Sequence, residues 1–271
     1  MKIKVVIPIY SIDLSKYEYK SLNQACTVLS KYSLVFMKPT SLDVSPILEK
    51  YPNIQTEEFD DKFFKDTIGY NQLMMLPEFY SRFLDSDYIL IYQLDAYVFR
   101  DELEAWCEKG YDYIGAPWFE KPIYRYAYAR WWRTVRRSWK KKKEKVLTEE
   151  EERQAQIINS VVAARTVNPV GNGGFSLRKV RSHYNTTIEL KDKINFYIQN
   201  KHSRSPVFNE DIFWASEPDC FSYPSMEEAL KFSFDKYPRI CYKKNGRQLP
   251  FGCHGWYKKR TLWFWKWIIR G

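Results

Sequence analysis

The sequence YILIYQLDAYVF, residues 88–99, contains the most apolar run of the chain and decides its predicted fold. Tyr88 to Tyr92 read as apolar on both faces, which is typical of a central parallel strand covered by helices on both sides. This strand leads directly into Asp95. Ligands of open α/β sheets bind beyond the carboxyl ends of the strands, so Asp95 is placed for a ligand or a metal. A carboxylate that merely caps the next turn is the alternative.

Upstream of this strand, predicted strands and helices alternate. The apolar residues between Leu22 and Leu29 recur at helical spacing, whereas the runs on either side are short and rich in strand-forming residues. The predicted strands are Lys4 to Tyr10, Ser33 to Met37 and Ile54 to Phe59, and the further predicted helices are Pro46 to Tyr51 and Asn71 to Leu84. This order predicts the α/β class, with a Rossmann-like, mostly parallel sheet flanked by helices.

The length allows one large globular domain or two small ones, and the absence of an internal repeat or a flexible linker favours one domain over residues 1–271 with an insertion. Hydrophobic residues make up 45% of the chain and charged residues 28%, and no apolar run approaches the roughly 20 residues of a transmembrane helix. The five cysteines are widely spaced without a CxxC pair, which indicates neither a disulfide framework nor a cysteine zinc site. Together these features predict a cytoplasmic protein with reduced cysteines.

The positive charge is concentrated in one segment. The chain carries a net charge of +10, and residues 121–145 alone contain eleven basic residues against a single acidic one. The rest of the chain is therefore neutral. A capping box, Thr148 with Glu151, predicts a helix that runs toward Ala164. We interpret residues 121–165 as a basic, aromatic helical insertion in the sheet domain.

Three further segments could carry chemistry. Val170 to Arg178, VGNGGFSLR, has three glycines that allow close approach of backbone to a ligand, although Gly-Asn-Gly is also a common turn. Glu210 and Asp211 precede an apolar helical run, either as acidic first-turn residues or as a general base held at a helix N-terminus. Pro250 to Trp256 is predicted to be a compact loop around His254, which is either a structural histidine or, given the two glycines beside it, a residue that contacts a ligand.

The order of these motifs resembles one known group of proteins. A strand that ends in Gln-x-Asp-Ala is followed by YDYIGAPW at 111–118, then by VGNGGFSLR, Glu-Asp and Phe-Gly-x-His-x-Trp. This series resembles the bacterial GT-A-type glycosyltransferases of polysaccharide clusters for capsule or O-antigen, usually described as a domain of unknown function. The resemblance spans Lys4 to Trp256 without the insertion. It implies a GT-A fold and an enzyme, an inverting glycosyltransferase that moves a sugar from a nucleotide-sugar donor to a glycan.

The resemblance also implies roles for individual residues. Asp211 matches the general base, with Glu210 beside it. Asp95 matches the first acid of the Asp-x-Asp motif, which with His254 would hold Mn²⁺ or Mg²⁺. The residues expected to bind the donor are Pro8, Ile9, Tyr10, Lys65, Gln93, Asp95, Asn172, Gly173 and Gly174.

The Asp-x-Asp motif is incomplete in this chain. It reads Asp95-Ala96-Tyr97, so the second acid is missing and the protein would supply few ligands to a hard cation. A divalent cation is therefore expected to bind only together with the donor. Lys65, or Lys243 and Lys244, could neutralise the departing diphosphate instead.

The expected partners follow from the resemblance and from the charge pattern. The donor is predicted to be a nucleotide sugar, with UDP favoured. The acceptor is predicted to be a glycan or a glycan linked to polyprenyl diphosphate. The insertion and the tail at residues 256–271 predict peripheral binding to the anionic inner face of the cell membrane, with no transmembrane segment. The residues of the insertion expected at the membrane are Trp131, Trp132, Arg136, Arg137, Trp139 and Lys140.

A nucleic-acid-binding protein is the alternative from another class. Its basis is the same basic and aromatic insertion, which could track phosphates and stack on bases. It leaves the neutral remainder and the ordered motifs unexplained, so no nucleic-acid partner is predicted.

Overall fold

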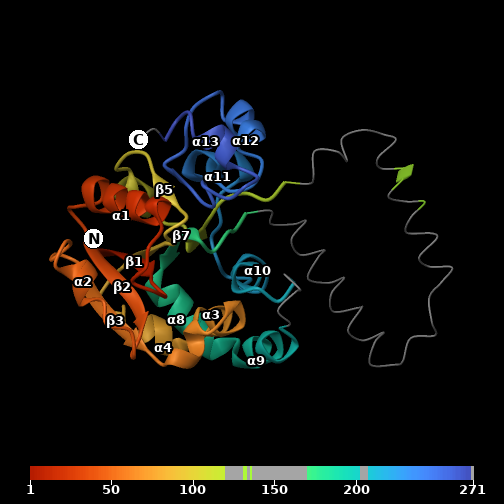
Figure 1. Ribbon diagram of the computed structural model, residues 1–271. Coiled ribbons are helices and arrows are strands. Elements are labelled where there is room, and N and C mark those ends of the chain that lie inside the picture. The colour runs from red at the N-terminus through yellow and green to blue at the C-terminus, as the bar shows by residue number, and fades with distance from the viewer. Residues whose placement is uncertain (120–130, 133–134, 136–169, 202–206, 270–271) are drawn as a thin grey trace.

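The computed structural model describes residues 1–119, 131–132, 135, 170–201 and 207–269 (Figure 1). A six-stranded sheet with the strand order β3-β2-β1-β4-β7-β6 forms its centre. The strands β1 to β4 run parallel, whereas β7 is antiparallel to both of its neighbours. The bounds are β1 Ile3–Pro8, β2 Ser33–Pro39, β3 Gln55–Phe59, β4 Tyr88–Tyr92, β6 Tyr113–Ile114 and β7 Phe175–Lys179. The predicted mostly parallel α/β sheet is confirmed.

Helices cover both faces of this sheet because its strands are apolar on both faces. Val5 and Ile7 of β1 belong to the core beneath α1, whereas Val6 between them belongs to the core beneath α3, α4 and α8. Burying one such side chain contributes about 1.5–3 kcal/mol. On the first face lie α1 Lys16–Val28, α2 Ser45–Leu48 and α5 Leu103–Glu108; on the second lie α3 Thr67–Leu73, α4 Pro77–Ser81, α8 Val180–Glu189, α9 Lys191–Asn200 and α10 Glu210–Ser216.

The helix predicted over Asn71 to Leu84 is two helices, α3 and α4. Leu76 between them is extended, and Pro77 is the first residue of α4. Proline has no N–H to donate and disfavours a helical residue before it, so the chain turns at this point. The turn leaves Tyr70 and Asn71 of α3 at the rim of the cavities described below.

A second, three-stranded sheet joins the end of β4 to the C-terminal part of the chain. Its order is β5-β9-β8, with β5 Tyr97–Val98, β8 Ser233–Phe234 and β9 Gly252–Cys253. The loop predicted at Pro250 to Trp256 therefore contains a strand, and His254 follows it directly. Around this sheet gather α11 Met226–Phe232, α12 Pro238–Lys244 and α13 Leu262–Trp265, drawn in blue in Figure 1.

The predicted membrane-binding tail is partly core. Trp265 and Ile269 are buried in the C-terminal core, whereas Trp263 and Trp267 are half or more exposed. Trp131 and Trp132 of the insertion are exposed as well. The rest of the predicted insertion, including Arg136, Arg137, Trp139 and Lys140, lies outside the described residues, as do residues 270 and 271 of the tail.

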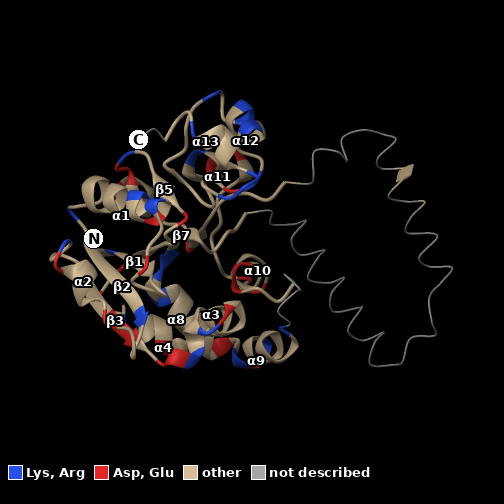
Figure 2. Ribbon diagram, viewed as in Figure 1, with Lys and Arg blue, Asp and Glu red and all other residues tan. Residues whose placement is uncertain are grey.

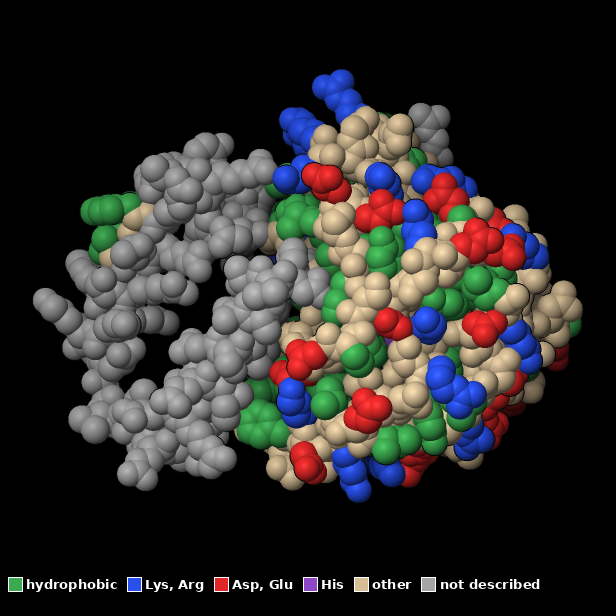
Figure 3. Space-filling view, turned by 180° about the vertical axis from the view of Figure 1, so that it is seen from behind, with side chains coloured by type: hydrophobic (Ala, Val, Ile, Leu, Met, Phe, Trp, Pro, Cys, Tyr) green, Lys and Arg blue, Asp and Glu red, His purple; other side chains and the backbone are tan. Residues whose placement is uncertain are grey.

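Basic and acidic side chains are mixed over the described surface. Figure 3 shows both signs interspersed on one face, and Figure 2 shows them distributed along the ribbons. This mixture agrees with the neutral charge of the chain outside residues 121–145. Within the described residues, no helix has both the length and the apolar character needed to span a bilayer.

Candidate active site

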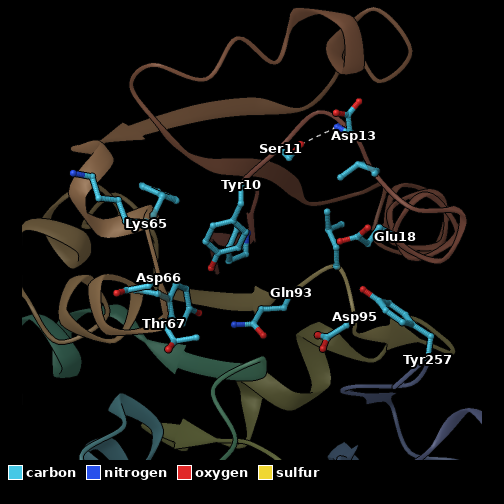
Figure 4. A pocket seen from close by; sticks show the side chains of 15 residues that line it. Tyr10, Ser11, Asp13, Glu18, Lys65, Asp66, Thr67, Gln93, Asp95 and Tyr257 are labelled. Carbon is cyan, nitrogen blue, oxygen red and sulfur yellow. Dashed lines mark hydrogen bonds between the residues drawn. The ribbon is translucent and has the colours of Figure 1, made fainter. Parts of the chain in front are cut away.

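The carboxyl ends of β1 and β4 form one wall of a cavity of about 510 Å³. Pro8 and Tyr10 come from the end of β1, and Gln93 and Asp95 come from the end of β4. Parallel strands end at the same edge of a sheet, so residues 83 or more positions apart meet here. Figure 4 shows Gln93 and Asp95 projecting into this cavity, with Tyr257 near Asp95. Lys65, at the end of the short 3-10 helix η1 Asp61–Phe64, lines the cavity as well.

Aromatic rings border this first cavity. Tyr10 is 47% exposed, and its ring lies 5.7 Å from that of Phe64 and 6.4 Å from that of Tyr70. An exposed ring beside a cavity offers a flat apolar surface to a planar ligand such as a nucleobase. Ile9, the remaining residue of the predicted donor-binding segment, is fully buried in the core and lines neither this cavity nor the next.

A second cavity of about 830 Å³ adjoins the first and shares Thr67, Tyr70 and Gln93 with it. Most of the predicted site residues meet here although they come from four separate segments. They are Gln93, Asn172, Gly173, Gly174, Glu210, Asp211 and His254. The structure therefore brings together the motifs whose order carried the resemblance.

Asp95 lies between two basic groups. Its Oδ1 is 3.0 Å from Nε2 of His254, and its Oδ2 is 2.7 Å from Nζ of Lys258. The other ring nitrogen of His254 is 3.2 Å from a carboxylate oxygen of Asp235. Burial alone would raise the pKa of Asp95, but His254 and Lys258 lower it well below its ordinary value. Burial likewise opposes the charged form of His254, yet Asp95 and Asp235 raise its pKa to about 9.

These contacts determine how well the site fits a divalent cation. A histidine binds a metal through a neutral ring nitrogen, whereas His254 between two carboxylates holds its proton at neutral pH. Both oxygens of Asp95 already face cations of the protein. Within the described residues, no cluster of three or more His, Cys, Asp or Glu side chains has the arrangement of a metal site. The residues present therefore do not fit a preformed metal site.

Glu210 is buried in an ion pair with Arg178. Nη2 of Arg178 lies 2.9 Å from one carboxylate oxygen of Glu210 and 3.2 Å from the other, and both side chains are almost fully buried. Arg178 also donates to the hydroxyl of Tyr80 at 2.8 Å and to that of Ser176 at 3.1 Å. Burial raises the pKa of Glu210 to about 7, although Arg178 opposes the rise. Glu210 is thus a structural carboxylate as well as part of the cavity wall.

Asp211 is the more accessible of the two acids at the start of α10. It is partly exposed and lines the second cavity, whereas only 3% of Glu210 is exposed. Asn209, the N-cap residue of α10, makes no side-chain capping hydrogen bond; its side-chain oxygen accepts a 2.6 Å bond from Lys201. The backbone N–H of Glu210 instead donates to the side chain of Asn71, which anchors the start of the helix to α3.

The glycines of VGNGGFSLR are required by close packing against the other site residues. A side chain on Gly173 would overlap the carboxylate of Glu210, and one on Gly174 would overlap the ring of His254. The side-chain oxygen of Asn172 is buried beside these glycines and has no hydrogen-bond partner among the described residues. Because buried polar atoms are normally paired, this oxygen is placed to accept a bond from a ligand.

Three residues of the site have no role in the sequence prediction: Arg178, Asp235 and Lys258. Arg178 lies in the glycine motif VGNGGFSLR without an assigned role, and the sequence places Lys258 only in the predicted membrane-binding tail. Lys243 and Lys244, the alternative partners for the diphosphate, line neither cavity, and Nζ of Lys244 lies over the ring of Phe119.

Comparisons with known proteins identify the family and the fold. A family model described as "Protein of unknown function (DUF5672)" matches residues 53–254. No curated protein matches the chain. The galactosyltransferase LgtC, solved with donor and acceptor sugar analogs, is 11% identical with a TM-score of 0.54, and the alignment covers 96% of this chain and 92% of that one.

Two further solved structures are similar at the same low level of identity. An active-site mutant of LgtC is 13% identical with a TM-score of 0.54 and the same coverage. Residues 1–349 of TarS from S. aureus are 14% identical with a TM-score of 0.40; the alignment covers 90% of this chain, which spans 65% of that one. The likeness to LgtC shows that the protein has a GT-A-like fold, as the resemblance implied.

Proposed function

The chain belongs to the DUF5672 family of proteins of unknown function, and we propose that it is a nucleotide-sugar-dependent glycosyltransferase. The observation that carries this proposal is the pair of adjoining cavities at the carboxyl end of the sheet. Asp95 with its two cations lies where they meet, and Asp211 lies across the second cavity. Sugar transfer needs this arrangement, because a donor and an acceptor must be held in line around one anomeric carbon.

The first cavity suits the nucleotide. The ring of Tyr10 can stack on the base, and Gln93 and Asn172 can bond to the ribose or the sugar. LgtC was solved in complex with donor and acceptor sugar analogs, which supports a two-substrate site on this fold. A UDP-sugar is the donor we favour.

Asp211 serves as the general base of an inverting transfer in this proposal. A sugar hydroxyl is a weak nucleophile, so a carboxylate has to accept its proton as it attacks the anomeric carbon. Asp211 is the accessible carboxylate among those that line the second cavity, because Glu210 is engaged by Arg178 and the buried Asp235 by His254. The backbone N–H of Glu210 bonds to Asn71, and its carboxylate packs closely against Gly173.

The leaving nucleoside diphosphate gains negative charge, which needs stabilisation. Lys258 and protonated His254 provide two cations at the boundary of the cavities. When a donor phosphate displaces Asp95 from Lys258, the lysine can bond to the phosphate oxygens. The sequence also predicts Mn²⁺ or Mg²⁺ bound by Asp95 and His254 once the donor is present; no step above depends on it.

The acceptor and the location complete the proposal. We propose that the enzyme extends a cell-surface polysaccharide, capsule or O-antigen, at the inner face of the cell membrane. The exposed Trp263 and Trp267 with Lys259, Arg260 and Lys266 around them support contact with an anionic surface, since rings favour the interface and cations the headgroups.

The variant Asp211→Asn tests the assignment of the base. It keeps the shape of the side chain but cannot accept the proton, so turnover should fall by about 10²–10⁴-fold. The measurement is the release of nucleoside diphosphate from a panel of nucleotide sugars with glycan acceptors. Asp219→Asn is the matched control, because Asp219 is exposed and lines neither cavity.

Each part of the proposal can fail separately. Wild-type turnover by Asp211→Asn would remove Asp211 as the base. Thermal-shift measurements with nucleotide sugars and with single-stranded oligonucleotides test the class of protein. A response to oligonucleotides alone, with an affinity that falls steeply with salt, would support the nucleic-acid-binding alternative instead.

A further inference from the structure

A third cavity, of about 630 Å³, lies next to the second one on the C-terminal side of the molecule. It is formed by the start of α12 and by the segment that leads into α13. The second and third cavities share Lys236, Lys259, Arg260 and Thr261, whereas the first and third share no lining residue. A molecule in the second cavity can therefore extend into the third on the side away from the nucleotide.

The third cavity is lined by four cations and by no acidic residue. The cations are Lys236, Arg239, Lys259 and Arg260. Lys258, directly beside them in sequence, is paired with Asp95, but none of the four forms an ion pair with a carboxylate of the described residues. Asp235 of the second cavity lies close enough to Lys236 to interact with it, but the four cations still outnumber the carboxylates near them. Like charges gathered in this way repel one another, and an anion bound among them would reduce the repulsion.

The remaining wall of the cavity is apolar. Trp263, 50% exposed, lies on this wall with Pro238 and Ile240. The indole N–H of Trp263 donates a 2.9 Å bond to the backbone oxygen of Arg260, which leaves the ring face as apolar surface. A small inorganic anion would use the cations alone, whereas an anion that carries a hydrocarbon group would use both parts of the wall.

We propose that the third cavity binds the phosphate or diphosphate of an amphiphilic acceptor, with its hydrocarbon group against Trp263. The inference rests on the proposed function, and it adds a binding site for the anionic end of the acceptor and for the hydrocarbon group next to it. The acceptor sugar then occupies the second cavity with its hydroxyl at Asp211, and its anionic end lies among Arg239, Lys259 and Arg260. The donor diphosphate and the acceptor phosphate thus have separate cations, Lys258 for the first and these residues for the second.

Geranyl diphosphate, a short amphiphilic diphosphate, is the probe for this site. Its affinity is measured by titration calorimetry on the full chain, with inorganic pyrophosphate as the anion without a hydrocarbon group. Arg239→Glu should weaken the binding of both probes by about tenfold or more, since a hydrogen bond to a charged group is lost and a repulsion is added. Trp263→Ala should weaken the binding of geranyl diphosphate alone. Neither residue lines the nucleotide cavity, so the thermal shift produced by nucleotide sugars should be unchanged.

Lys243→Glu is the matched control. Lys243 is an exposed cation of the same helix, α12, and does not line the cavity, so its reversal changes the net charge equally and should leave both affinities unchanged. Equal weakening by Lys243→Glu and Arg239→Glu would overturn the proposal. So would wild-type affinity in both Arg239→Glu and Trp263→Ala, or displacement of geranyl diphosphate by a single-stranded oligonucleotide.

The two proposals fail in different measurements. A wild-type chain without any response to nucleotide sugars would refute the glycosyltransferase, and with it the acceptor role of the cavity. A chain that responds to nucleotide sugars but binds geranyl diphosphate independently of Arg239 and Trp263 would refute the acceptor site alone.

Discussion

Replacing Arg178 by methionine removes the cation of the buried ion pair and leaves the carboxylate of Glu210 in the core. The guanidinium contacts both carboxylate oxygens, at 2.9 and 3.2 Å, and it also bonds to Tyr80 and Ser176. Methionine fills a similar volume without the charge. We expect the free energy of unfolding to fall by about 3–5 kcal/mol, the usual cost of removing one partner of a buried pair.

The loss should depend on pH, because Glu210 can escape it by taking up a proton. Burial raises its folded pKa from 4.5 to about 7, and Arg178 opposes this rise, so the pKa is higher still in the variant. Asp211 acts in the same direction as burial. Tyr70, Tyr80 and Tyr113 also face the pair, and they stay neutral since burial raises the pKa of each.

The direction of this pH dependence follows from the number of protons that the folded and unfolded states bind. The pKa of Glu210 is higher in the folded state than in the unfolded state, so the folded state binds more protons at pH values between these two pKa values. The contribution of Glu210 to stability is therefore fully present below about pH 4.5 and is lost as the pH rises through the folded pKa. Each pH unit inside this window changes the stability by up to about 1.4 kcal/mol. Arg178→Met should therefore be less destabilising at about pH 5.5 than at about pH 8.5. At the higher pH the unpaired carboxylate of Glu210 is either charged in the core or protonated against the solution pH, and both states reduce the free energy of unfolding.

Urea denaturation at both pH values measures this difference. Arg100→Met is the control, because Arg100 lies at the surface, where it pairs with Glu102 and donates to the backbone oxygens of Leu249 and Pro250. Its loss leaves no buried carboxylate unpaired, so it should cost less and equally at both pH values. An Arg178→Met variant as stable as the wild type at the higher pH, or one with the larger loss at the lower pH, would refute the reasoning.

Mn²⁺ titrated into the donor-free protein should bind weakly, because Asp95 is paired with His254 and Lys258, and it should bind more tightly once a nucleotide sugar supplies phosphate ligands. Tight binding to the donor-free protein, or full activity after exhaustive chelation, contradicts this. Deletion of residues 124–143 should reduce co-sedimentation with anionic vesicles, since each cation near an anionic leaflet contributes about 1 kcal/mol. Equal binding to neutral and anionic vesicles, or binding that the deletion does not change, contradicts the membrane contact.

The N-terminal half of the fold could be predicted because its signals are local. The apolar run of β4 and the helical spacing from Leu22 to Leu29 each specify an element within about ten residues, and both elements are present. The break at Pro77 is local as well, and a proline within an apolar periodicity predicts it. The two-residue strand β9 has no comparable signal, because its pairing with β5 and β8 depends on tertiary packing.

In the candidate site, too, local sequence signals can be predicted and tertiary contacts cannot. The sequence predicts which segments contribute, because Asp95, His254 and Asp211 lie in motifs with distinctive residues. It does not predict which charges pair, since the partners of Asp95 and Glu210 come from distant segments. Lys258 looks like one more cation of a basic tail until the fold places it against Asp95.

The bond from the indole of Trp256 to the hydroxyl of Ser21 spans 235 positions, and β9 reaches back to β5 in the same way. This closure has a consequence for synthesis on the ribosome. A nascent chain that has emerged only as far as α10 possesses every strand of the six-stranded sheet and the carboxylate of Asp211, but neither His254 nor Lys258. The six-stranded sheet can thus begin to fold before the two residues that pair with Asp95 have been synthesised, and the candidate site is completed only when the segment after β9 joins it.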